Sequence, residues 1–212
     1  MAETIAARRE ALSRLRQLGG ALSLDFVNAI DPRYGPRAHD FFCDYTDFVL
    51  WAADVNSIDN AVAARLLKVA GEAVDDAGAV FADVVSARER LYRVLVAAIA
   101  GSSPEADDLR GLQVALRVAS SHRLLEPKPG GYGWSWQDDQ HLECPLWPVL
   151  IDAAELLTTS DLARVKMCPG RDCGWLFLDR SKNRSRRWCS MDICGSRDKM
   201  RRLHARRRSA PS

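Results

Sequence analysis

Four cysteines near the C-terminal end are the residues whose type and spacing indicate chemistry. Cys168, Cys173, Cys189 and Cys194 follow the pattern C-x4-C-x15-C-x4-C. Two short-spaced pairs put two thiolates on each of two tight turns, and four thiolates about 2.3 Å from one Zn²⁺ form a closed structural site. The alternative is two disulfides or unrelated buried thiols, but paired cysteines in a chain with no mark of secretion favour a metal. We therefore expect one structural zinc ion per chain.

The segments around these cysteines predict a zinc-held hairpin that leads into a basic helix. Three short segments favour a strand, a turn and a returning strand, in the order 175–178, 181–184 and 186–188. Gly195 then permits a bend, and we expect a helix over residues 196–208. Met200 and Leu203 lie three residues apart, so we expect them to pack on the zinc-binding part.

Charge is strongly segregated along the 212 residues, although the net charge is only +2. Residues 1–163 hold 15 Lys and Arg against 24 Asp and Glu, a net charge of −9. Residues 164–212 hold 15 Lys and Arg against 4 Asp and Glu, a net charge of +11. A basic end on an acidic body indicates a polyanion as partner, and a solvated basic tail is the alternative.

The basic residues divide into two groups of candidate nucleic-acid contacts. Those of the expected hairpin suit phosphates, which supply affinity and register but no sequence information: Arg180, Lys182, Arg184, Arg186 and Arg187. Those of the expected helix are Arg197, Lys199, Arg201, Arg202 and His204. Arg197, Arg201 and His204 share one helical face, and arginine paired with guanine is the commonest specific contact in a major groove. Arg206, Arg207 and Arg208 suit the backbone beyond it.

Duplex DNA, RNA and an acidic protein are three different partners for this basic end. RNA readers expose aromatic side chains for stacking on unpaired bases. Trp175, Phe177 and Trp188 have the spacing of a small hydrophobic core instead, which favours duplex DNA. An RNA-binding zinc protein and a zinc-stabilised protein-interaction module stay open as alternatives.

The C-terminal run resembles the CGNR-type zinc finger, named for a Cys-Gly-Asn-Arg tetrad at its last ligand. The tetrad here is residues 194–197, CGSR, with Ser196 in the Asn position, and the flanking residues 176–191 also look like the family. In that family the finger follows a domain called ABATE, which residues 21–28 (ALSLDFVN) and 153–157 (AAELL) resemble. The resemblance implies a transcriptional regulator, with residues 1–163 as a ligand-sensing or dimerisation domain and 164–212 as the finger. It therefore implies a small-molecule effector and a homodimer as further partners.

Apolar periodicity predicts a mainly α fold with a small β-hairpin (α+β). The expected helices cover 5–18, 44–54, 61–73, 79–100, 104–120 and 146–157, and the expected hairpin lies within 122–143. Residues 21–30 favour a short strand or an extended segment that leads into a helix. Its polar residues, Asp25 and Asn28, suit capping or turns, and contact with an effector is the alternative. No Pro/Gly-rich linker precedes the finger, so we expect it to dock on the body.

The sequence offers little for an enzyme or a membrane protein. It has no G-x-S-x-G, H-E-x-x-H, Walker or G-x-G-x-x-G motif, and four cysteines leave zinc no open position. We therefore expect no enzyme. The charged N-terminal residues lack the apolar stretch of a signal peptide, and no run of eighteen apolar residues occurs, so we expect a cytoplasmic protein.

Overall fold

The computed structural model describes residues 4–137 and 141–208. Its elements, in chain order, are α1 (Ile5–Leu12), α2 (Leu22–Val27), α3 (Tyr45–Asp54), α4 (Asn60–Glu72), α5 (Val74–Ile99), α6 (Ala106–Ser121), β1 (Arg123–Lys128), β2 (Gly131–Trp136), α7 (Leu146–Thr158), a 3-10 helix (Ser160–Arg164), β3 (Val165–Met167), β4 (Leu176–Leu178), a π-helical turn (Met191–Gly195) and α8 (Ser196–Arg208). The fold is mainly helical with two small antiparallel hairpins, as the sequence predicts.

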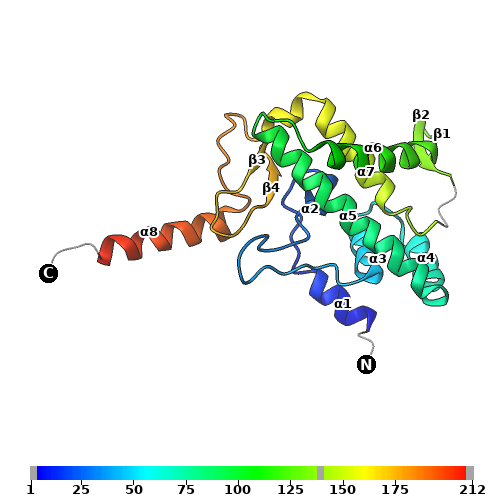
Figure 1. The fold of residues 1–212 in the computed structure, drawn as a ribbon, viewed down its shortest axis with the longest axis horizontal. Coiled ribbons are helices and arrows are strands. Elements are labelled where there is room, and N and C mark those ends of the chain that lie inside the picture. The colour runs from blue at the N-terminus through cyan, green and yellow to red at the C-terminus, as the bar shows by residue number, and fades with distance from the viewer. Residues whose placement is uncertain (1–3, 138–140, 209–212) are drawn as a thin grey trace.

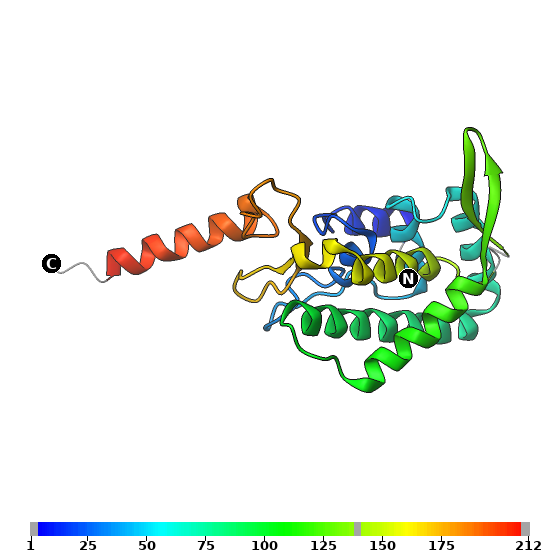
Figure 2. The ribbon, with the colours of Figure 1, turned by 90° about the horizontal axis from the view of Figure 1, so that it is seen from above.

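The long helix α5 is the centre of the helical body. It contacts α2, α3, α4, α6 and α7, and Figures 1 and 2 show it running the length of the body. Val84, Leu91 and Leu95 on its inner face are buried, in keeping with the apolar stripe of the sequence.

The predicted helices over 44–54, 61–73, 79–100, 104–120 and 146–157 are confirmed as α3, α4, α5, α6 and α7, although α5 begins at Val74 and not near residue 79. Aspartate side chains cap two of them. Asp44 Oδ1 accepts from the Asp47 N–H at 3.2 Å, and Asp59 Oδ1 accepts from the Val62 N–H at 2.8 Å. Each bond satisfies an N–H that the first turn of a helix leaves unpaired.

Two N-terminal predictions are wrong. The first helix ends at Leu12 rather than near residue 18, although Leu15 is still buried. Residues 22–27 form helix α2 and not a strand. Polar and apolar residues alternate there, but α2 packs against α5, α7 and β4, so Ser23 is buried as fully as Leu24. The alternation therefore does not mark one buried face.

The hairpin of β1 and β2 is confirmed, with Leu125 paired to Trp134. Its two tryptophans differ in environment. Trp136 packs towards the core, with its ring centroid 5.8 Å from that of Trp147. Trp134 is 52% exposed and lies beneath the Arg123 guanidinium, so only one of the pair covers the core.

The finger's hairpin pairs different segments from those predicted. β4 is the expected strand, but its partner is β3, with Lys166 opposite Phe177. Residues 186–188 run as an irregular segment, because Arg186 folds back and donates to main-chain carbonyls of Trp188 (3.1 Å) and Cys189 (2.6 Å). The first cysteine pair therefore lies in the connection between the two strands of this hairpin.

Helix α8 is present as predicted and extends away from the rest of the protein (Figures 1 and 2). The expected packing of Met200 and Leu203 on the zinc-binding part is wrong, since they are 50% and 39% exposed. Only the start of α8 packs on the zinc-binding part, where Asp198 is buried. Beyond that turn, the side chains from Lys199 to Arg207 are exposed.

One connected set of buried side chains runs from the helical body into the finger and includes the four cysteines. The expected docking of the finger is thus confirmed. Within residues 4–137 and 141–208, no helix combines the length and apolar character needed to cross a bilayer.

Candidate metal centre and nucleic-acid interface

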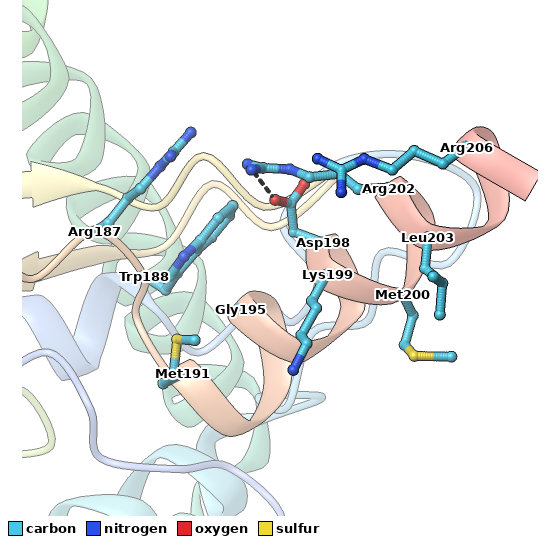
Figure 3. Close-up of a pocket in the computed structure, with 10 residues that line it drawn as sticks. All are labelled: Arg187, Trp188, Met191, Gly195, Asp198, Lys199, Met200, Arg202, Leu203 and Arg206. Carbon is cyan, nitrogen blue, oxygen red and sulfur yellow. Dashed lines mark ion pairs between the residues drawn. The ribbon is translucent and has the colours of Figure 1, made fainter.

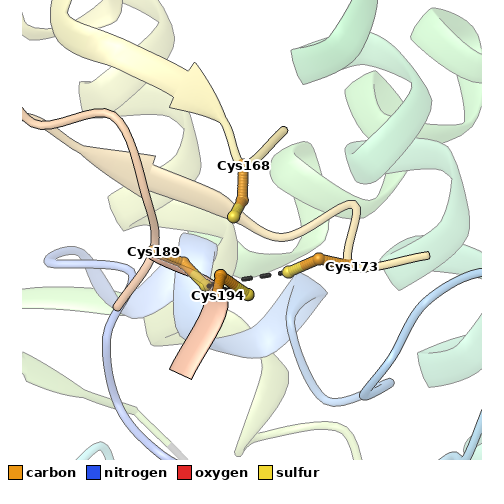
Figure 4. Close-up of side chains that lie close together, drawn as sticks. All are labelled: Cys168, Cys173, Cys189 and Cys194. Atoms are coloured by element: carbon orange, nitrogen blue, oxygen red, sulfur yellow. Dashed lines mark hydrogen bonds between the residues drawn. The ribbon is translucent and has the colours of Figure 1, made fainter. Parts of the chain in front are cut away.

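The four cysteine sulfurs converge on one point, as Figure 4 shows. All four Sγ atoms lie within 4.8 Å of one another, with 3.7 Å between Cys173 and Cys189 and 3.6 Å between Cys189 and Cys194. These separations are too long for disulfide bonds. A tetrahedron with metal–sulfur distances of about 2.3 Å has edges of about 3.8 Å, so the sulfurs are placed to hold one structural zinc ion. This confirms the predicted ligand set.

Two tight turns present the sulfurs in pairs. In the first, the Cys168 N–H donates to the Trp175 carbonyl at 2.8 Å and the Cys173 N–H to the Gly170 carbonyl at 3.0 Å. In the second, the Cys194 N–H donates to the Ser190 carbonyl at 3.0 Å. Main-chain bonds thus close both turns independently of the metal.

The four thiols lie so close together that they change one another's pKa. All four cysteines are buried, and hydrogen bonds from its neighbours, led by Cys173, lower the pKa of the Cys168 thiol. The thiolate is the form that binds metal. Four adjacent thiols cannot all ionise without a compensating cation, and a bound Zn²⁺ supplies that charge.

The helical body completes the edge of the finger's hairpin. The Leu176 N–H and carbonyl point away from β3, and the Asn28 side chain bonds both: its Nδ2 donates to the carbonyl at 2.8 Å and its Oδ1 accepts from the N–H at 2.9 Å. The Leu178 N–H donates to the Gly19 carbonyl at 2.7 Å. Residues 19 and 28 therefore take the place of a third strand beside β4.

The loop after α2 holds the other side of the first turn. The N–H groups of Arg33 and Tyr34 donate to the carbonyls of Cys173 (3.0 Å) and Asp172 (2.9 Å), and the Tyr92 hydroxyl of α5 donates to the Gly174 carbonyl at 2.8 Å. Gly174 has a φ of +67°, and a Cβ there would lie 2.4 Å from the Tyr34 ring. Glycine is therefore required at this contact.

Charged groups beneath that loop link it to α5. Arg33 is buried against the Tyr92 ring, with its guanidinium 3.4 Å from the ring centroid, and pairs with Glu89 at 2.5 Å. Arg88 pairs with Asp40 through two hydrogen bonds of 2.8 and 2.5 Å. Paired buried charges are costly to break one at a time, so this network fixes the loop on α5.

Most of the predicted nucleic-acid contacts lie on the surface. Among the candidates, the exposed side chains are Arg180, Lys182, Arg184, Arg187, Arg197, Lys199, Arg201, Arg202 and His204. Arg186 is the exception, because its guanidinium also donates to the Leu18 carbonyl at 3.0 Å and lies 4.4 Å from the Phe177 ring centroid. Its donors serve the finger's own main chain, so the structure gives it a packing role and not a phosphate contact.

Asp198 organises the base of α8. It is buried, pairs with Arg202 at 2.6 Å and also hydrogen-bonds Arg201. A groove of about 420 Å³ runs beside it, lined at its finger end by Trp188 and Met191. Figure 3 shows Arg202 next to Asp198, with Met200 and Leu203 on the other side of the helix. α8 thus carries a basic surface interrupted by an apolar strip.

Asp25 and Asn28 both have structural partners, whereas the effector contact proposed for them stays a prediction. Asn28 is buried and uses both amide atoms on Leu176. Asp25 accepts from the Gly19 N–H at 2.7 Å, and burial raises its pKa to about 6, aided by the nearby Asp152 charge.

The sequence analysis missed two residues that shape the finger. Lys166 donates to the Asp179 carboxylate at 2.6 Å and to the carbonyls of Arg184 (2.6 Å) and Arg186 (3.1 Å). The hydrogen bond from Lys166 to the carboxylate lowers the pKa of Asp179. In the sequence, Lys166 alternates with the apolar residues Val165 and Met167, as in a strand. Three residues are too few for this alternation to predict a strand.

Comparison with known families agrees with the two-part arrangement. Residues 20–160 match ABATE, a family described as "Putative stress-induced transcription regulator", and residues 164–207 match the CGNR zinc finger. No curated protein matches the chain. The ABATE match covers about two thirds of the chain, and the finger match contains all four zinc ligands. The chain therefore belongs to the ABATE family and ends in a CGNR zinc finger.

Proposed function

We propose that this protein is a DNA-binding transcription regulator whose helix α8 enters the major groove of duplex DNA. The function is binding and not catalysis. Four protein thiolates fill the coordination of the zinc ion, so its contribution is to hold the finger together.

The observation that carries the proposal is that the side chains of α8 are exposed while its first turn is held by the zinc-binding part. α8 has 13 residues, about 20 Å of helix, and holds seven Lys and Arg against one Asp. Its side chains from Lys199 to Arg207 are exposed. A major groove about 12 Å wide admits one α-helix. The zinc-holding turn and the pairing of Asp198 fix the direction in which α8 leaves the protein.

The finger's aromatic residues support duplex DNA over single-stranded RNA. Trp175 and Phe177 are 3% and 0% exposed, and the Trp175 Nε1–H donates to the Ile30 carbonyl at 2.8 Å. Trp188 is half-buried and has Arg187 over its ring. Base stacking needs an open aromatic face, which the two buried rings do not offer.

A hollow in the helical body is linked to the finger through α5, which supports a ligand-sensing role for the body. A hollow of about 300 Å³ lies between α5, α6 and α7, and its apolar lining residues include Ala115 and Trp147. That volume is at the lower end for small-molecule sites. One face of α5 lines it through Ala87, and another face bonds the finger through Tyr92. A compound that stabilises the protein against heat, but not its Ala115→Trp variant, would identify this hollow as the effector site.

The test is selection of the zinc-loaded full-length protein against random duplex DNA at near-physiological salt, with a chelator-treated control. We expect one motif to be enriched and the enrichment to be lost on chelation. The symmetry of the motif would then report dimerisation. Binding without enrichment would contradict sequence reading, and preferential binding of RNA would favour the alternative function.

Variants of α8 separate base contacts from phosphate contacts. Arg197→Ala and Arg201→Ala should each reduce discrimination between the selected motif and a one-base mismatch by about 1–3 kcal/mol. Arg207→Ala, on the same helix, should weaken binding to both sequences equally. Uniform losses in all three variants would show that Arg197 and Arg201 contact phosphates only.

A further inference from the structure

Two adjoining hollows beside the zinc site are lined by arginines from both parts of the chain. One encloses about 50 Å³ and the other about 170 Å³. Arg171 and Arg197 line both, so the two hollows share a wall. Their arginines, named here the junction arginines, are Arg14, Arg16, Arg37, Arg171, Arg197 and Arg201.

Half of the junction arginines belong to the helical body. Arg14 and Arg16 follow α1, and Arg37 lies in the loop between α2 and α3. In Figure 1 this loop, coloured blue, lies on the side of the body from which α8 leaves. Residues 1–163 carry a net charge of −9, so basic residues gathered at this one edge oppose the charge of the body as a whole.

Positive charge exceeds negative charge in these hollows. Six arginines line them against three carboxylates, those of Asp31, Asp172 and Asp198. All six arginines are exposed, although Arg201 is paired with Asp198, Arg14 with Glu10 and Arg171 with Asp172. Burial raises the pKa of Asp31, but the charges of Arg197 and Arg16 act to lower it, which places both guanidinium groups near one carboxylate.

Two of the junction arginines, Arg197 and Arg201, belong to one face of α8, and the others lie beside it. Arg197 and Arg201 lie four residues apart, so they project from the same side of the helix and line the second hollow with Arg37. Guanidinium groups bind phosphate through paired hydrogen bonds. A phosphate group held on this side of α8 would therefore lie next to Arg37 of the body.

We propose that Arg14, Arg16 and Arg37 of the helical body bind the phosphodiester backbone of the same duplex that α8 enters. This inference rests on the proposed DNA-binding function and assigns part of the DNA surface to the helical body, with Arg37 inside the ABATE match and Arg14 and Arg16 just before it. Phosphate contacts on both sides of the zinc site fix the angle of α8 in the groove, because such contacts set register and orientation. A composite surface of this kind requires the finger to be docked on the body, as it is.

The experiment measures affinity of the full-length, zinc-loaded protein for its selected duplex by fluorescence anisotropy between 50 and 200 mM salt. Arg16→Ala, Arg37→Ala and their combination are compared with Arg117→Ala, an exposed arginine of α6 that lies outside the junction arginines. Arg16→Lys and Arg37→Lys keep the charge and control for loss of structure. Zinc content and thermal unfolding confirm that each variant is folded.

Each alanine substitution should weaken binding roughly two- to fivefold, equally for matched and mismatched duplexes. The double variant should lower the slope of log affinity against log salt by about two, since each phosphate contact contributes about 0.9. The lysine variants should keep the slope, and Arg117→Ala should behave as wild type. An unchanged slope in the double variant overturns this inference and leaves the proposed function standing. Failure of the wild type to bind any duplex overturns both.

Discussion

Replacing Asn28 with alanine should leave the edge of β4 buried without hydrogen-bond partners and loosen the finger from the helical body. Asn28 is 1% exposed and Leu176 is 0% exposed, so water cannot replace the amide. The substitution leaves the Leu176 N–H and carbonyl buried without the partners now at 2.9 and 2.8 Å. Each such unsatisfied group costs about 1–3 kcal/mol, so we expect a loss of about 2–6 kcal/mol in the free energy of unfolding. This is a large share of the roughly 5–15 kcal/mol typical of folded proteins.

Urea unfolding followed by circular dichroism measures this loss, and amide exchange across residues 176–178 localises it. Asn183→Ala removes an exposed asparagine of the same finger and is the matched control. Asn28→Asp still accepts from the Leu176 N–H but sets a carboxylate oxygen against its carbonyl, so it should destabilise the protein at least as much as alanine. A loss below about 0.5 kcal/mol for Asn28→Ala, the range of ordinary surface substitutions, would refute the role given to this side chain.

Two further predictions concern the metal and pH. Cys168→Ser and Cys189→Ser should each abolish zinc binding and duplex binding, measured by elemental analysis and anisotropy, whereas Cys43→Ser, an exposed cysteine outside the cluster, should change neither. Zinc retained in both cluster variants would refute the four-cysteine site. Burial raises the pKa of Asp25 to about 6, so the folded state binds this proton more tightly than the unfolded state does. Its contribution to stability should therefore fall by about 3 kcal/mol between pH 3 and 7, and Asp25→Asn should remove that part of the pH dependence in urea unfolding.

The zinc ligands and the larger helices are predictable from the sequence because their signals are local. Two cysteine pairs at short spacing define the metal site whatever the rest of the chain does. The stripes of α3 to α7 and the cap at Asp59 follow from the 3.6-residue period and from the donors that a first turn leaves free. The charge contrast between the two parts also needs no structure, since it is a property of composition.

Burial on several sides and pairing between distant segments are not predictable in this way. Helix α2 has no polar face to reveal its period, because α5, α7 and β4 surround it. β4 pairs with β3 and not with residues 186–188. The Arg186 side chain folds back and donates to the main-chain carbonyl of Cys189, so this segment is not extended as a strand. The sequence places Met200 and Leu203 on a helical face, but the direction of α8 decides that this face meets solvent.

The sequence by itself therefore determined the metal, its ligands, the helical class of the body and the basic character of the last helix. These depend on residue types at fixed local spacings. Only the tertiary structure decided that Asn28 closes the edge of β4, that Tyr92 of α5 bonds the zinc-holding turn, and that Arg14, Arg16 and Arg37 of the body line hollows with Arg197 of α8. The physical reason is that unpaired main-chain groups and buried charges take their partners from whichever segment packing brings near, often more than a hundred residues away.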